Sequence, residues 1–151
     1  MATVEVTFTP LPVHVRTARL VATAVARRSG VAESLLDEVR LAVGEACSRA
    51  VEAHLRHCPG QPIRVELTDN GEQFEVVVTD AVPEAADGNG AGSRDTTDGH
   101  GGGFAVLDGE VPLQLPDGVG LAVIAGLADD VRIASAGPGT SVTMSWKRRA
   151  G

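Results

Sequence analysis

The stretch EVRLAVGEACSRAV, residues 38–51, is the most informative part of this chain about its fold because it carries two patterns on one helix. Its apolar residues belong to a stripe at helical spacing, formed by Leu36, Val39, Val43, Cys47 and Ala50. At about 100° per residue, a second side of the same helix carries the charged residues Glu45, Arg49 and Glu52. The pattern predicts a helix over about 34–57 that packs on a core and presents a polar triplet away from it.

The polar triplet has an ordinary explanation as surface ion pairs. Glu45 with Arg49 has i,i+4 spacing and Arg49 with Glu52 has i,i+3 spacing. Such pairs stabilise a solvated helix by about 0.2–0.5 kcal/mol each. A catalytic or binding function for these residues therefore needs support from the rest of the chain.

The remaining sequence predicts an α+β two-layer sandwich. Alternating apolar and polar residues predict strands at 4–8, 63–67, 74–78, 131–134 and 141–146, and helical spacing predicts further helices at 13–28 and 119–128. Asp69-Asn70-Gly71 predicts a hairpin, and Ser34 with Asp37 resembles a capping box for the second helix. The order of elements suits a mixed or antiparallel sheet covered on one face by helices.

The 151 residues, of which 43% are hydrophobic, are enough for one compact domain. Regular periodicity is lost over about 83–116, where glycines stand among Asp, Ser and Thr. We therefore expect a single domain, 1–151, with a long glycine-rich flexible lid. The acidic residues and histidine of this segment have no preorganised spacing, and we expect no metal site there.

Composition and charge exclude several classes of partner. The net charge of -7 repels a phosphate backbone, and three Phe, one Trp and no Tyr leave little for bases to stack on, so direct nucleic-acid binding is not expected. Neither a signal peptide nor a run of about 18 apolar residues is present, which indicates a cytoplasmic protein without a membrane span. Cys47 and Cys58, about 16 Å apart along one helix, are expected to be reduced.

The element order and three local motifs resemble the anti-sigma-factor serine-kinase branch of the GHKL (Bergerat-fold) ATP-binding proteins, which also include gyrase and histidine kinases. EACSRAV, residues 45–51, occupies the family's Glu-x-x-x-Asn box. The resemblance implies that Glu45 is the general base, and it aligns Arg49 with the asparagine that helps to hold Mg²⁺. A guanidinium has five donors and no acceptor, so Arg49 cannot be a magnesium ligand.

The second and third family boxes concern the nucleotide. VVVTDAVPE, residues 76–84, supplies Asp80 for the adenine-contacting Asp-x-Gly-x-Gly box, but Val82 and Glu84 replace its glycines. Asp80 is equally explained as a strand-end residue that starts a turn. The family's phosphate-binding Gly-x-Gly-Leu and the segment that follows it match Gly118, Gly120, Leu121 and Thr140, although the glycines are also explained as a hinge.

Three functions follow from these observations. The first is an anti-sigma factor or pseudokinase that binds proteins in a partner-switching circuit, with ATP or ADP binding doubtful and magnesium absent. For this function the resemblance implies a homodimer, a sigma factor and a STAS-domain anti-anti-sigma antagonist as partners, with Arg16 and Arg19 of the first helix as candidate contacts. The second is an active serine-protein kinase that phosphorylates the antagonist with Glu45 as base. In the third, Arg49 grips phosphate oxygens directly and replaces the metal.

Overall fold

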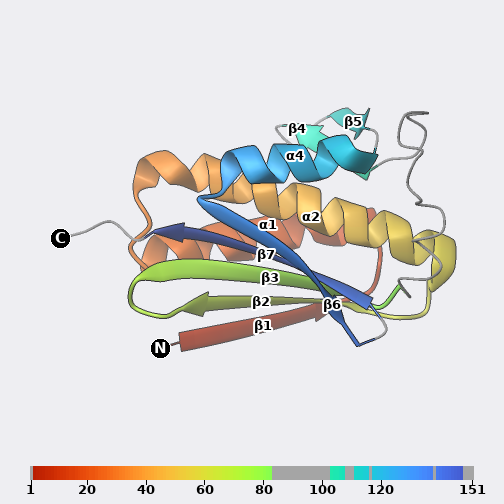
Figure 1. Ribbon diagram of the computed structural model, residues 1–151, viewed down its shortest axis with the longest axis horizontal. Coiled ribbons are helices and arrows are strands. Elements are labelled where there is room, and N and C mark those ends of the chain that lie inside the picture. Colours follow the sequence, from red (N-terminus) through yellow and green to blue (C-terminus); the bar gives the residue numbers. More distant parts are fainter. Residues whose placement is uncertain (1, 83–102, 108–110, 116, 138, 148–151) are drawn as a thin grey trace.

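The computed structural model describes residues 2–82, 103–107, 111–115, 117–137 and 139–147, which form two layers (Figure 1). One layer is a five-stranded sheet of β1 (Ala2–Phe8), β2 (Ile63–Asp69), β3 (Gln73–Asp80), β6 (Asp130–Ala136) and β7 (Gly139–Lys147). The other layer consists of the helices α1 (Pro12–Arg28), α2 (Leu36–His57) and α4 (Asp117–Leu127), which cover one face of the sheet. The α+β sandwich expected from the sequence is confirmed.

The sheet has the strand order β1-β2-β3-β7-β6, so β3 and β7, far apart in the sequence, are neighbours. Every neighbouring pair is antiparallel, so the sheet is antiparallel and not mixed. The predicted hairpin joins β2 to β3. In this turn Gly71 has a φ of 95°, and the Asn70 side chain accepts hydrogen bonds from the backbone N–H groups of Glu72 and Gln73. The turn therefore follows from local side-chain chemistry.

The two long helices begin in different ways. Pro12 starts α1, where its missing N–H has no hydrogen-bond partner to lose and its fixed φ suits a helix. A short 3-10 helix, η1 (Glu33–Leu35), leads into α2, and no side chain caps that helix. The expected capping box at Ser34 is therefore wrong, because Ser34 lies inside the 3-10 turn and Leu35 stands at the N-cap of α2.

A second, two-stranded sheet consists of β4 (Gly103–Leu107) and β5 (Val111–Leu115). It contacts α2 and α4 and lies on the side of the helices away from the large sheet (Figure 1). The sequence predicted no regular structure over 83–116, and this is wrong for the second half of that range. The sequence pattern of these two strands is weak because both are short and because Pro112 is an unusual residue inside a strand. Residues 83–102 lie outside the described residues, so the lid remains a prediction.

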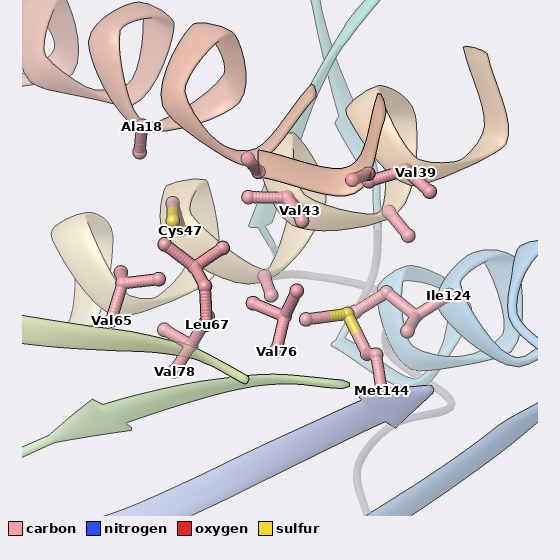
Figure 2. Packing of buried hydrophobic residues seen from close by; sticks show 14 of the residues in the cluster. Ala18, Val39, Val43, Cys47, Val65, Leu67, Val76, Val78, Ile124 and Met144 are labelled. Carbon is pink, nitrogen blue, oxygen red and sulfur yellow. The ribbon is translucent and has the colours of Figure 1, made fainter. Parts of the chain in front are cut away.

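The core fills the space between the two layers (Figure 2). Val43 and Cys47 of α2 point toward Leu67 and Val76 of the sheet, and Ile124 of α4 meets Met144 of β7. The largest buried side chain, Trp146, packs near Phe74 and donates a hydrogen bond from Nε1 to the Leu127 carbonyl at 2.9 Å. This bond ties β7 to the end of α4.

Both cysteines are free, as expected, with Cys47 buried in the core and Cys58 half-buried at the end of α2. None of the helices in the described ranges combines the length and the apolar character needed to cross a bilayer.

Candidate functional site

The central part of α2 is buried on every side. Residues 42–48 are all buried, because α2 contacts β3 of the sheet, the neighbouring helices α1 and α4, and strand β4. Glu45 is only 2% exposed, whereas Arg49 and Glu52 are half-buried. The explanation of the triplet as surface ion pairs on a solvated helix face is therefore wrong for Glu45. The helix pattern shows one apolar stripe but does not show that other elements cover its second side.

Glu45, which the resemblance implies to be the general base, is a buried carboxyl group on α2. Neither of its oxygens accepts a hydrogen bond within the described part of the chain. Burial raises the pKa of Glu45 from 4.5 to about 7, with the Arg49 guanidinium opposing and the Glu52 carboxylate reinforcing that shift. A carboxyl with a pKa near neutrality is able to accept and release a proton at physiological pH.

Arg49 lies about one turn further along α2 and acts electrostatically on Glu45. Its neighbour Glu52 forms an ion pair with Arg56, with 4.0 Å between Oε2 and Nη1. Within the described residues no three His, Cys, Asp or Glu side chains form a group that could hold a metal ion. The guanidinium of Arg49 supplies no acceptor, so this side chain cannot coordinate magnesium.

Asp80 ends β3 and lies opposite Thr140 of β7 in the sheet register. Its Oδ1 accepts a hydrogen bond from the Val82 N–H at 2.9 Å and another from the Thr140 N–H at 3.3 Å. Val82, at a position where the resemblance implies a glycine, is 3% exposed. The structure therefore brings Asp80 and Thr140 together, and one oxygen of the Asp80 carboxylate binds the backbone amides of Val82 and Thr140.

Gly139, next to Thr140, makes this approach of β3 and β7 possible. A Cβ atom at position 139 would lie 1.8 Å from the Asp80 carbonyl oxygen, so only glycine fits without a shift of the backbone. The sequence gave no sign of this contact, because Gly139 and Asp80 are far apart in the chain.

Gly118, Gly120 and Leu121 lie in the first turns of α4 (Asp117–Leu127), as the resemblance implied. Because α4 packs against α2, the structure places the helix of the third box beside the helix that carries Glu45 and Arg49. The segments that the resemblance assigns to the three family boxes therefore belong to neighbouring elements.

The two arginines expected to contact partners differ in their surroundings. Arg16 is exposed on α1, but Arg19 is 7% exposed and lies across Gly44 of α2. The expectation that Arg19 is a surface residue is therefore wrong. The signal was in the sequence, since Arg19 stands at helical spacing from the buried residues Val15, Ala22 and Ala26.

His54 is a residue of this region that the sequence reading missed. It is 0% exposed, and its ring nitrogens contact the Gln61 carbonyl and the Ala81 N–H, each at 2.9 Å. Its position continues the apolar stripe of α2 beyond Ala50 by four residues, which was the available signal for burial.

The antiparallel sheet with helices on one face and the buried glutamate on α2 define the architecture as that of a GHKL-type ATPase domain. A family model described as histidine kinase-like ATPase domain matches residues 8–146, and the chain belongs to this family.

Comparison with solved structures shows similarity to the RsbU and RsbW domains of Rv1364c from Mycobacterium tuberculosis, with a TM-score of 0.61 and 18% sequence identity. The similarity covers 99% of this chain and 34% of that chain, so the present chain spans about a third of its length. At this identity the likeness concerns the fold alone. A comparison with curated proteins gave no match.

Proposed function

We propose that this protein is a regulator of the anti-sigma-factor type that works by binding other proteins in a partner-switching circuit controlling transcription. In this proposal ATP binding and kinase activity are weakened or lost. The observation that carries it is the presence of Arg49 at the position where a magnesium-holding asparagine would stand, within electrostatic range of Glu45. The similarity in fold to a chain that contains an RsbW domain is consistent with a regulatory role.

The physical argument concerns charge. Phosphoryl transfer depends on positioning the phosphate and neutralising its charge, and the metal ion supplies most of that neutralisation. Arg49 offers only donors and cannot take over the role of a metal ligand. An arginine where the family's metal-holding asparagine is expected therefore supports a scaffold that has given up catalysis.

A surface suited to protein binding is available on α1. Val13 is 65% exposed and Leu20 is 58% exposed, seven residues apart on one helix face, with the exposed Arg16 between them. Exposed apolar side chains next to an arginine are typical of protein interfaces. We assign this face to partner binding, with a sigma factor, a STAS-domain antagonist and a second copy of the chain as the proposed partners.

The alternative is an active serine-protein kinase, and one observation favours it. Glu45 is retained, and its pKa of about 7 suits a general base that takes a proton from a serine hydroxyl. The two functions differ in whether MgATP binds, which is a direct measurement.

The nucleotide test is calorimetric titration of MgATP, and of ATP with EDTA, into the wild type, Arg49→Asn, Arg49→Lys and Arg49→Ala. We expect little or no heat from the wild type in either titration. Tight binding that requires magnesium would support the kinase instead. Binding that is unchanged by EDTA and lost in Arg49→Ala would show that the guanidinium binds the phosphate oxygens directly.

The partner test compares two exposed leucines. Affinity capture from the native host with the wild-type chain, followed by mass spectrometry, should recover a sigma factor or a STAS-domain protein. Leu20→Asp on α1 should abolish this recovery, whereas Leu55→Asp, at a 47% exposed site on α2, should retain it. Equal capture by both variants would exclude the α1 face.

A further inference from the structure

The imidazole of His54 is held in one neutral tautomer. A backbone N–H is only a donor, so the 2.9 Å contact from Ala81 requires a lone pair on Nε2. The proton is then on Nδ1, where it is donated to the Gln61 carbonyl at 2.9 Å. The side chain is 0% exposed, so water does not compete for either nitrogen.

These two hydrogen bonds join three segments of the chain. His54 belongs to the last turn of α2, Gln61 to the connection into β2, and Ala81 to the turn directly after β3. The next amide, that of Val82, bonds to the Asp80 carboxylate, so two successive N–H groups beyond β3 are held by side chains. The turn at residues 80–82 is therefore held both from α2 and by its own aspartate.

We infer that His54 is a positioning residue that fixes the turn at 80–82, and with it the Asp80 carboxylate, relative to α2. The same helix carries Glu45 and Arg49, so His54 sets the placement of two family boxes with respect to each other. The inference rests on the proposed function in one respect, because it assumes that the residues of α2 and Asp80 belong to the same site. His54 acts through the lone pair on Nε2, which accepts the hydrogen bond from the Ala81 N–H, and no other atom of the ring can accept this bond.

The test uses His54→Asn and His54→Gln in the full chain, with amide hydrogen exchange followed by NMR. Asn retains a donor near the Nδ1 position but has no acceptor at Nε2, whereas Gln places an amide oxygen near Nε2. We expect the Ala81 amide to exchange at least tenfold faster in His54→Asn, with most of the protection restored in His54→Gln.

Three further amides distinguish a positioning role for His54 from a general effect on stability. The Val82 N–H bonds to Asp80 and not to His54, so faster exchange at Val82 in His54→Asn is expected only if His54 positions the turn. Amides of the core residues Val43 and Val76 should change by less than twofold. Equal acceleration at the core sites, or unchanged exchange at Ala81 or Val82, would overturn the inference.

If the variants fail to fold, a measurement on the wild-type protein still tests the inference. The ring ¹⁵N shifts of His54 should show a protonated Nδ1 and an unprotonated Nε2, and the opposite tautomer would contradict the inference. None of these readouts involves nucleotide or a partner, so their failure is distinct from failure of the proposed function.

Discussion

Arg19 of α1 lies directly over Gly44 of α2, at a contact between the two helices. A Cβ atom on Gly44 would come within 2.7 Å of Cδ and 3.3 Å of Cγ of Arg19. The missing side chain at position 44 therefore makes room for a long side chain to become buried. Burial raises the pKa of the Cys47 thiol to about 12, and the positive charge of Arg19 acts in the opposite direction, toward a lower pKa.

Gly44→Ala should destabilise the protein because the new methyl group overlaps the middle of the Arg19 side chain. Overpacking of this kind costs about 1–3 kcal/mol, partly offset by the gain of about 1 kcal/mol for Ala over Gly in a helix. We expect a net loss of about 1 kcal/mol in the free energy of unfolding, measured by urea denaturation.

The matched control is Gly126→Ala in α4, where an added Cβ meets nothing within 4 Å. This variant should gain about 0.5–1 kcal/mol from helix propensity alone. If the two alanine variants changed stability in the same direction, the Arg19 contact would not be the cause.

Gly139→Ala should be more damaging, since its Cβ would lie 1.8 Å from the backbone oxygen of Asp80. Backbone cannot move aside as a side chain can, so the end of the β3–β7 ladder has to open. We expect a loss of about 3 kcal/mol in the free energy of unfolding, the upper part of the range for overpacking. Gly60→Ala, at an open site, is the control and should be close to neutral. A wild-type-like melting curve for Gly139→Ala would refute this prediction.

The carboxyl ¹³C resonance of Glu45 should titrate with a midpoint of about 7. Removing the guanidinium in Arg49→Asn should raise this midpoint, because Arg49 favours the charged carboxylate. Arg49→Lys keeps a positive charge and should leave the midpoint nearer to that of the wild type. A midpoint near 4.5 in the wild type would mean that Glu45 is solvated.

The raised pKa of Glu45 also sets the direction of a pH effect on stability. Between about pH 4.5 and 7 the folded protein holds a proton that the unfolded chain has released, so stability falls as pH rises through this window. At about 1.4 kcal/mol per pKa unit the loss is on the order of 3 kcal/mol. Glu45→Gln has no titrating carboxyl group at this position, so this loss of stability with rising pH does not occur in the variant. Its stability relative to the wild type should therefore be greater at pH 8 than at pH 4.5, and a constant difference would contradict the shift.

The two thiols should react at different rates. Cys47 is 0% exposed with a pKa of about 12, so iodoacetamide should not modify it in the folded protein. Cys58 is half-buried and should react slowly, because partial burial and the nearby Asp80 carboxylate raise its pKa. Mass spectrometry should show one modification in the native state, absent in Cys58→Ser, and two in urea. Native modification of Cys47 would show that the core opens readily.

The parts of the structure that the sequence predicted well are those controlled by neighbouring residues. The turn at Asn70-Gly71 forms because its side chains bond to their own backbone, and the stripe containing Val43 and Cys47 follows from helix periodicity. The β4–β5 hairpin and the burial of Arg19 were not predicted. A short strand has a weak pattern, and the burial of Arg19 depends on a glycine in another helix.

Local periodicity and short motifs were sufficient to predict the order of the elements other than β4 and β5, the face of α2 that meets the sheet and the family of the domain. The burial and the hydrogen bonds of the candidate site could be seen only in the folded protein. Burial of Glu45 depends on how remote elements such as α4 and β4 pack on α2, and the bonds from Asp80 to Thr140 and from His54 to Ala81 join distant parts of the chain. The physical reason is that a carboxyl's solvation and a side chain's hydrogen-bond partners are set by whatever the fold brings within a few ångströms, which no local pattern records.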